Sequence, residues 1–231
     1  MNSKSSKAEL KTFFNSPPVR KLKRQLCDIG RRMWQREYVD GNGGNLAIRV
    51  GRDLALCTPT QISKGFMRPE DICLVDFDCN QLAGAKKFTS EIQMHLQIMQ
   101  RRPEAVATCH GHPPSATGFA VAGIKPPTGL VTEFELFVSL AMVPYRTPGT
   151  RELGKFVAEH ADEHNTMLLA NHGVVSWSHR NLEDAYFKLE ILENYCRTVL
   201  AAKQTGVPAR RLTKPQLGEL FAIKKRLGNL I

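Results

Sequence analysis

The chain has 231 residues, of which 42% are hydrophobic and 23% are charged, which is typical of one globular domain and excludes a disordered or fibrous protein. No stretch approaches the roughly 18 uninterrupted apolar residues of a membrane-spanning helix, and the first residues lack a secretory signal, so we expect a cytoplasmic protein with no membrane partner. The net charge of +10 comes from the two ends, because Lys and Arg outnumber Asp and Glu by 10 to 4 in residues 1–40 and by 7 to 1 in residues 203–231. These basic residues alternate with apolar ones, as on the solvated faces of amphipathic helices, and we expect no nucleic-acid partner.

In chain order, residues 1–18 begin with a Ser- and Lys-rich stretch and are expected to form a flexible N-terminus. Apolar residues then recur at three- and four-residue spacing, which predicts a helix over 19–38. After a glycine-rich turn at 41–45, β-rich runs predict strands over 46–50, 54–57 and 72–77. The remaining predictions are helices over 90–100 (capped by Ser90), 150–164, 182–202 and 217–227, and strands over 105–110 and 167–170.

No internal repeat or linker divides the chain, so we expect a single domain over residues 1–231. Strands and helices alternate without a strict βαβ rhythm, which predicts an α/β fold whose sheet is covered by helices on both faces. The six cysteines are scattered and form no CxxC pair. They therefore predict reduced thiols rather than a disulfide framework.

The segment around His110 and His112 carries the first chemical signal. Side chains alternate between the faces of a strand, so these two imidazoles, two residues apart, point the same way and can share a metal ion. Gly111 allows a close approach of a neighbouring segment, and Pro113-Pro114 ends the strand. A three-residue pattern is weak by itself, and one core histidine beside one exposed histidine remains the alternative.

His172 strengthens this reading, because it follows the apolar strand at 167–170 and precedes a glycine, again at the end of a strand. By itself it could be an ordinary core histidine. Three histidine ligands would leave one coordination position open, and an open position is typical of catalytic rather than structural zinc.

Glu91 follows Ser90 at a predicted helix start, where the helix dipole stabilises a carboxylate. It is either a simple acidic residue of the first turn or a base beside the metal, able to take a proton from an activated carbon. The glycine-rich turn ending in Gly44 and Asn45 exposes backbone N–H groups that could hold a phosphate. Thr58-Pro59-Thr60 and Thr89-Ser90 add hydroxyl groups and a helix N-terminus, although each signal is weak alone.

Other candidates are interpreted as structural. The segment from His160 to His164 fits the His-x-x-Glu-His spelling of an inverted metalloprotease motif, but it lies at the polar end of a predicted amphipathic helix and is a chance match. His95 and His179 are isolated and are predicted to be structural or surface residues. Trp34 and Trp177 are predicted to lie in or at the edge of the core.

Several motifs occur in a fixed order along the chain: Gly43-Gly44-Asn45-Leu46-Ala47, Thr58-Pro59-Thr60, Lys64-Gly65, Met67-Arg68-Pro69-Glu70-Asp71-Ile72, Ser90-Glu91, His110-x-His112-Pro113-Pro114, Thr147-Pro148-Gly149-Thr150 and Ala170-Asn171-His172-Gly173. Together they resemble the class II aldolase/adducin family over about residues 20–227. The sugar-phosphate branch of that family includes L-fuculose-1-phosphate aldolase and L-ribulose-5-phosphate 4-epimerase.

The resemblance implies a three-layer αβα fold with a central mixed, largely antiparallel sheet, assembled as a C4-like homotetramer with sites between subunits. It implies one Zn²⁺ per subunit, held by His110, His112 and His172, with Glu91 as the catalytic acid/base. The residues implied to bind the phosphate of a small phosphorylated sugar are Gly44, Asn45, Thr60, Thr89 and Ser90.

The implied reaction is the cleavage of a ketose 1-phosphate, such as L-fuculose 1-phosphate, to dihydroxyacetone phosphate and an aldehyde such as lactaldehyde. The chain departs from the family pattern at Gln61, where the aldolase usually has glycine. The tyrosines that donate a proton in the aldolase have no counterpart here, although Glu133 could substitute. A sugar-phosphate 4-epimerase or decarboxylase with the same metal site, and a non-catalytic adducin-like binding module, are the alternatives.

Overall fold

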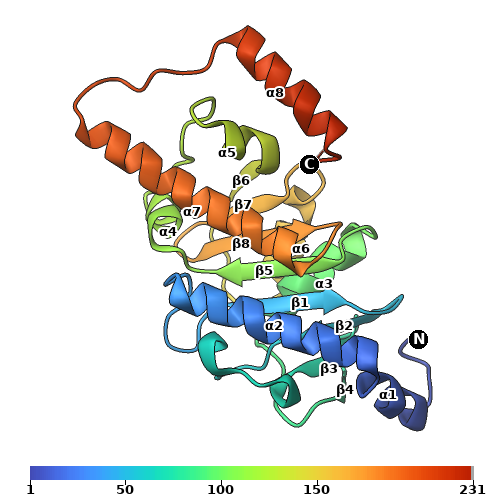
Figure 1. Cartoon of the computed structure of the whole chain (residues 1–231). Coiled ribbons are helices and arrows are strands. Elements are labelled where there is room, and N and C mark those ends of the chain that lie inside the picture. The colour runs from blue at the N-terminus through green and yellow to red at the C-terminus, as the bar shows by residue number, and fades with distance from the viewer. Residues whose placement is uncertain (230–231) are drawn as a thin grey trace.

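A central β-sheet organises the molecule, whose structure, a computed structural model, describes residues 1–229 (Figure 1). In these residues the sheet has eight strands in the order β4-β3-β2-β1-β5-β8-β7-β6. Neighbouring strands are antiparallel except β6 and β7, which are parallel. The strands are β1 (Asn45–Arg49), β2 (Leu54–Cys57), β3 (Cys73–Asp76), β4 (Gln81–Ala83), β5 (Ala107–Gly111), β6 (Leu140–Val143), β7 (Thr166–Leu169) and β8 (Gly173–Ser178).

Helices cover both faces of the sheet. In Figure 1, α2 and α7 lie in front of it and α3 and α6 behind it. The helices are α1 (Lys7–Phe14), α2 (Pro17–Gln35), α3 (Ile92–Arg101), α4 (Pro114–Val121), α5 (Thr132–Phe137), α6 (Arg151–His160), α7 (Leu182–Gln204) and α8 (Lys214–Arg226), with 3-10 turns η1 (Lys64–Phe66) and η2 (Pro69–Asp71). None of the helices in the described part of the chain is long and apolar enough to cross a bilayer.

Alternation along the strands separates two cores. In β1, Leu46 and Ile48 join the apolar cluster beneath α2 and α7. Ala47, between them, faces the cluster formed with α3 and α6, as expected for side chains that alternate between the faces of a strand. The expected three-layer αβα arrangement with a mixed, largely antiparallel sheet is therefore confirmed.

Most predicted elements are present within a few residues, and two details were wrong. The helix expected from Ser90 begins at Ile92, with Glu91 in the N-cap position and no side-chain cap. The helix expected over 150–164 ends at His160. The sequence analysis missed β4, β6, β8, α4 and α5. Each of them has at most eight residues, and periodicity is a weak signal over so short a length.

The N-terminal residues, expected to be flexible, include α1. Ser6 and Glu9 form a capping box at its start, and Leu10 and Phe14 are buried in the core beneath α2. The Ser-x-x-Glu spelling at residues 6–9 is a recognisable helix-start signal. All six cysteines are free thiols, as predicted.

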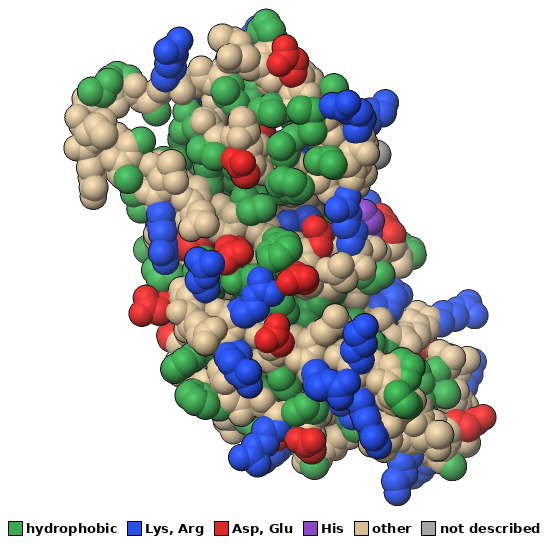
Figure 2. Space-filling model, in the orientation of Figure 1, with side chains coloured by type: hydrophobic (Ala, Val, Ile, Leu, Met, Phe, Trp, Pro, Cys, Tyr) green, Lys and Arg blue, Asp and Glu red, His purple; other side chains and the backbone are tan. Residues whose placement is uncertain are grey.

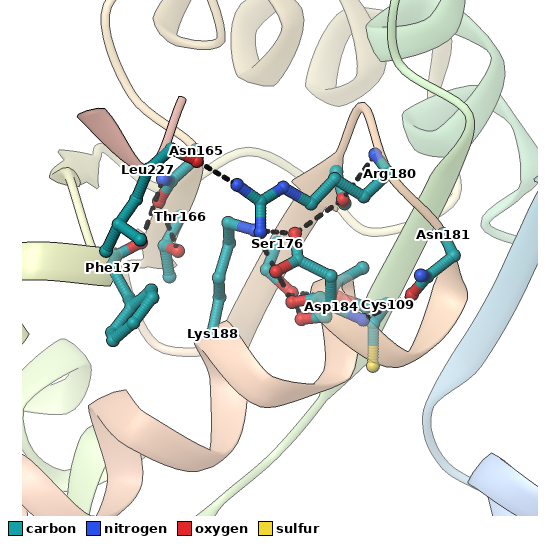
Figure 3. Close-up of polar contacts among 12 residues, drawn as sticks. Cys109, Phe137, Asn165, Thr166, Ser176, Arg180, Asn181, Asp184, Lys188 and Leu227 are labelled. Atoms are coloured by element: carbon teal, nitrogen blue, oxygen red, sulfur yellow. Dashed lines mark hydrogen bonds and ion pairs between the residues drawn. The ribbon is translucent and has the colours of Figure 1, made fainter. Parts of the chain in front are cut away.

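The C-terminal end of α8 is attached to the turn before α7 (Figure 3). Arg180 donates a hydrogen bond to the carbonyl of Leu227. Close by, Asp184 accepts a hydrogen bond from the Ser178 hydroxyl at 2.6 Å and pairs with the buried ammonium of Lys188. These contacts connect β8, α7 and the end of α8.

Candidate metal centre and phosphate cavity

Three histidines converge where two neighbouring central strands, β5 and β8, meet at one end of the sheet. His110 lies in β5, His112 follows it directly, and His172 lies in the turn between β7 and β8. The antiparallel pairing of β5 with β8 brings this turn beside the end of β5. One nitrogen from each ring lies within 4.8 Å of the others. The convergence predicted from the sequence is therefore present.

Hydrogen bonds orient two of the rings. The His110 Nδ1 atom is 2.8 Å from the carbonyl oxygen of Val174, and His112 Nδ1 is 3.3 Å from Oδ1 of Asp40. Both partners are acceptors, so each Nδ1 donates a hydrogen bond and each Nε2 is the ring atom left to bind a metal ion. The two Nε2 atoms are only 3.2 Å apart. Two lone pairs this close repel each other unless a cation lies between them.

Glu91 completes the cluster. Its Oε2 is 3.2 Å from Nε2 of His110 and its Oε1 is 3.3 Å from Nε2 of His172. Burial raises the pKa of this carboxyl, but the adjacent His110 and His172 rings and a hydrogen bond from Asn45 outweigh burial and hold its pKa well below the usual range. Glu91 is therefore ionised at neutral pH, and its Oε1 has no hydrogen-bond donor among the described residues.

A buried chain of hydrogen bonds leads from Thr108 through His95 and Asn45 to Glu91. The Thr108 hydroxyl is 2.6 Å from Nδ1 of His95, and His95 Nε2 is 2.5 Å from Oδ1 of Asn45. The Asn45 amide then donates to Oε2 of Glu91 at 2.7 Å. Since the Asn45 oxygen can only accept, His95 donates to it and accepts from Thr108. His95, interpreted from the sequence as structural or on the surface, is fully buried and positions the carboxylate.

The three-histidine cluster fits a divalent metal ion. Imidazole binds metal only in its neutral form. Burial, reinforced by the neighbouring His110, lowers the pKa of His172 to about 4, and burial likewise lowers the pKa of His112. The Nδ1 of His172 is buried without a partner. Three imidazole nitrogens with an adjacent carboxylate match the donor set of an open zinc site.

A cavity of about 290 Å³ opens beside this cluster. Its lining includes His112 and Glu91 and all five residues predicted to bind phosphate: Gly44, Asn45, Thr60, Thr89 and Ser90. Gly44 has a φ of +70°, and a Cβ at this position would lie 3.0 Å from the carbonyl oxygen of His110. The close approach of the turn to β5 therefore requires glycine.

Two further cavity residues depart from simple expectation. Gln61 has a φ of +57°, the left-handed conformation that favours the glycine usual at this position in the aldolases. Lys64, which the sequence analysis used only as part of a motif, is buried and lines the cavity. Its Nζ donates to the carbonyls of Asn42 at 2.9 Å and Ile62 at 2.6 Å, and burial lowers its pKa to about 8.

Other candidates lie elsewhere. Glu133 is exposed on α5, where its carboxylate accepts from Thr132, and it lines a different cavity with residues of α7. His160 is hydrogen-bonded to the carbonyl of Phe156, and His164 to the hydroxyl of Ser139. Neither belongs to the three-histidine cluster. Trp34, expected in or near the core, is 44% exposed, whereas Trp177 is buried.

Comparisons with known proteins point in one direction. A family model described as "Class II Aldolase and Adducin N-terminal domain" matches residues 24–200. The chain is 40% identical to an L-fuculose phosphate aldolase of Methanococcus maripaludis over 171 residues, which cover 73% of this chain and 91% of that protein.

Of two further similarities, the first names a decarboxylase and the second again names an aldolase. A 3-oxo-tetronate 4-phosphate decarboxylase of Haemophilus influenzae is 28% identical over 203 residues, which cover 86% of this chain and 95% of that protein. A solved structure of an L-fuculose 1-phosphate aldolase has a TM-score of 0.80 at 25% identity, covering 90% of this chain and 96% of that one.

Proposed function

Because the chain belongs to the class II aldolase and adducin family, we propose that it is a metal-dependent carbon–carbon lyase acting on a small phosphorylated sugar. The observation that carries the proposal is the position of Glu91, which contacts two of the three converging histidines and also lines a cavity rich in phosphate-binding groups. This arrangement supports the proposal, because it would bring a base, a set of metal ligands and an anion-binding surface together in one site.

The proposed substrate is a ketose 1-phosphate resembling L-fuculose 1-phosphate, cleaved to dihydroxyacetone phosphate and an aldehyde such as lactaldehyde. The activity named for the relative that is 40% identical supports this choice. In the cavity, the turn at Gly44 and the hydroxyls of Thr60 and Ser90 would hold the phosphate. The ammonium of Lys64 would supply the positive charge that a phosphate dianion requires.

Glu91 would handle the proton. Its Oε2 accepts a hydrogen bond from the Asn45 amide, so Oε1, which has no hydrogen-bond partner among the described residues, would be the basic atom. A divalent metal ion held by His110, His112 and His172, which we propose to be one Zn²⁺ per chain, would act as a Lewis acid on the substrate's carbonyl and hydroxyl oxygens. The buried partners of Glu91 fix its position before substrate arrives, which reduces the cost of organising the site.

We further propose a homotetramer with sites between subunits. Within one chain, Glu133 lines a cavity other than the one beside Glu91. If Glu133 is the second proton donor, it must therefore come from a neighbouring subunit. Sedimentation analysis of the purified protein tests the assembly, and a monomer with full activity would exclude this source of the proton.

Decarboxylation is the second candidate, favoured by the similarity to the Haemophilus influenzae decarboxylase over 86% of this chain. Loss of CO₂ from a 3-oxo acid leaves an enolate, as does retro-aldol cleavage, so the same metal and phosphate groups would serve. The difference lies in the proton transfer, for which the tyrosines of the aldolase are missing here.

The test compares products from a panel of ketose 1-phosphates and 3-oxo-tetronate 4-phosphate. We expect dihydroxyacetone phosphate from the ketose 1-phosphates, detected by a coupled reductase assay, and loss of activity after chelation with recovery on adding Zn²⁺. Release of CO₂ together with dihydroxyacetone phosphate from 3-oxo-tetronate 4-phosphate, with no aldehyde formed from the ketose 1-phosphates, would select the decarboxylase. Absence of turnover together with absence of bound metal would select the binding module.

A further inference from the structure

A second and larger cavity, of about 600 Å³, lies beside the first half of α2, separate from the cavity next to Glu91. Residues from α1, the first half of α2, η2 and the segment after β4 line it. It shares no lining residue with the cavity beside Glu91. Four of its lining residues are cations: Lys11, Arg20, Lys23 and Arg24.

The protein balances these cations only in part. None of the four forms an ion pair with a carboxylate among the described residues. Glu70 is the acidic residue that lines the cavity. Figure 2 shows several Lys and Arg side chains gathered over α1 and the adjoining half of α2. The cavity therefore has an excess of positive charge.

Lys23 shows that the site is built rather than only exposed. The sequence analysis placed it on a solvated helix face, but the residue is only 5% exposed. Its Nζ lies 3.1 Å from the centre of the Phe14 ring, and no hydrogen-bond acceptor or carboxylate is recorded for it within residues 1–229. Burial and the nearby Arg20 lower its pKa. The side chain is therefore packed along its length, while its ammonium contacts the Phe14 ring, has no carboxylate partner and lines the cavity, where an anion can reach it.

We propose that this cavity binds a small anion carrying two phosphate groups. Its volume is in the range of about 300–1,000 Å³ found for small-molecule sites. Two guanidinium groups and two ammonium groups line one cavity with a single carboxylate, and this excess of positive charge suits a diphosphate better than a single phosphate. The cations converge on a hollow rather than following a long stripe, which argues against nucleic acid.

The site lies apart from the proposed catalytic machinery. Lys11, Arg20 and Lys23 precede residues 24–200, the part matched by the family model. The proposal therefore does not depend on the lyase activity, and variants here should leave that activity unchanged.

Inorganic pyrophosphate is the probe. The wild-type protein is titrated by calorimetry and compared with an R20Q/R24Q variant, whose two altered side chains are exposed and have no recorded hydrogen bond. R31Q is the matched control, because Arg31 is an exposed arginine of α2 that does not line the cavity. A K23M variant tests the Lys23 ammonium, with thermal unfolding as a check that it folds.

We expect two pyrophosphate sites per wild-type chain, one in each cavity. R20Q/R24Q and K23M should each weaken one site by at least about tenfold, while R31Q keeps both. Equal binding by wild type and R20Q/R24Q, or an equal loss in R31Q, would refute the proposal. Tighter binding of a single-stranded oligonucleotide than of pyrophosphate, with a steep salt dependence, would assign the surface to nucleic acid instead.

Discussion

At the scale of single residues, Glu91 is the group whose chemistry is most open to measurement. Replacement by glutamine keeps its shape and its contact with Asn45 but removes its basicity. We expect E91Q to lower kcat by about 10²- to 10⁴-fold while retaining bound metal, because the three imidazoles remain. Metal analysis and steady-state kinetics check both parts. E133Q is the comparison variant, and an equal loss there would identify Glu133 as the second proton donor.

Lys64 offers a test of phosphate recognition. We expect K64M to raise KM for a phosphorylated substrate by about 10- to 100-fold, the value of a hydrogen bond to a charged group. Because burial lowers the Lys64 pKa to about 8, the ammonium is charged below that pH and neutral above it. Wild-type KM should therefore rise as the pH passes 8, and K64M should lack this rise. K21M, at an exposed lysine of α2, is the control.

Gln61 carries backbone strain. In the left-handed region a non-glycine residue costs about 1–2 kcal/mol, and glycine relieves this at a cost of about 0.5–1 kcal/mol in chain entropy. We therefore expect Q61G to stabilise the protein by about 0.5–1 kcal/mol in urea unfolding. E37G is the matched variant, since Glu37 has a φ of +60° and lies outside the cavity. A change in KM confined to Q61G would show that the Gln61 side chain contacts substrate.

The residue scale also shows what sequence reasoning missed. His110, His112 and His172 were predictable because each stands at a strand end beside glycine or proline. His95 lies within a helix, and no spacing rule relates it to Asn45, fifty residues earlier. Nothing in the sequence around Lys64 indicated burial, yet the folded chain buries it. Such groups depend on contacts between segments distant in the chain, which local patterns do not encode.

At the scale of elements, the close pairing of β5 and β8 sets the geometry of the metal cluster. A Cβ at Gly173 would lie 2.6 Å from both the Gly111 carbonyl oxygen and Cδ2 of His112. We expect G173A to destabilise the protein by about 1–3 kcal/mol and to weaken metal binding, because the His112 ring must move. G118A, in a helix with open space around its Cα, should be neutral or stabilising. Equal effects of the two changes would contradict this account.

Long or strongly patterned elements were predictable, and short ones were not. The helix at 182–202 and the strands at 54–57 and 167–170 carry clear apolar patterns and are present within three residues. By contrast, β8 reads Gly-Val-Val-Ser-Trp-Ser, and burial on both faces removes the alternation that would have revealed it. This strand supplies the Val174 carbonyl that orients His110.

At the scale of the whole molecule, buried histidines link stability to pH. Burial lowers the pKa of His95 to about 3, whereas an unfolded chain binds this proton near pH 6.5. The unfolded state therefore holds more protons between these values, and the free energy of unfolding should fall as the pH decreases from 7 towards 4, by about 1.4 kcal/mol per pH unit for each such histidine. Urea unfolding of chelated protein measures the slope, which should be shallower in H95Q. An unchanged slope would show that other groups are responsible.

The cluster draws its parts from β1, α3, β5 and the β7–β8 turn, which span residues 45 to 172. In an unfolded chain these segments are not held together, so the chain offers a cation only separate, weak ligands. If the site holds the metal ion that we propose, tight binding would require the assembled sheet and α3, and the bound ion would then oppose their separation. The metal content of a preparation would in that case report how completely its molecules have folded.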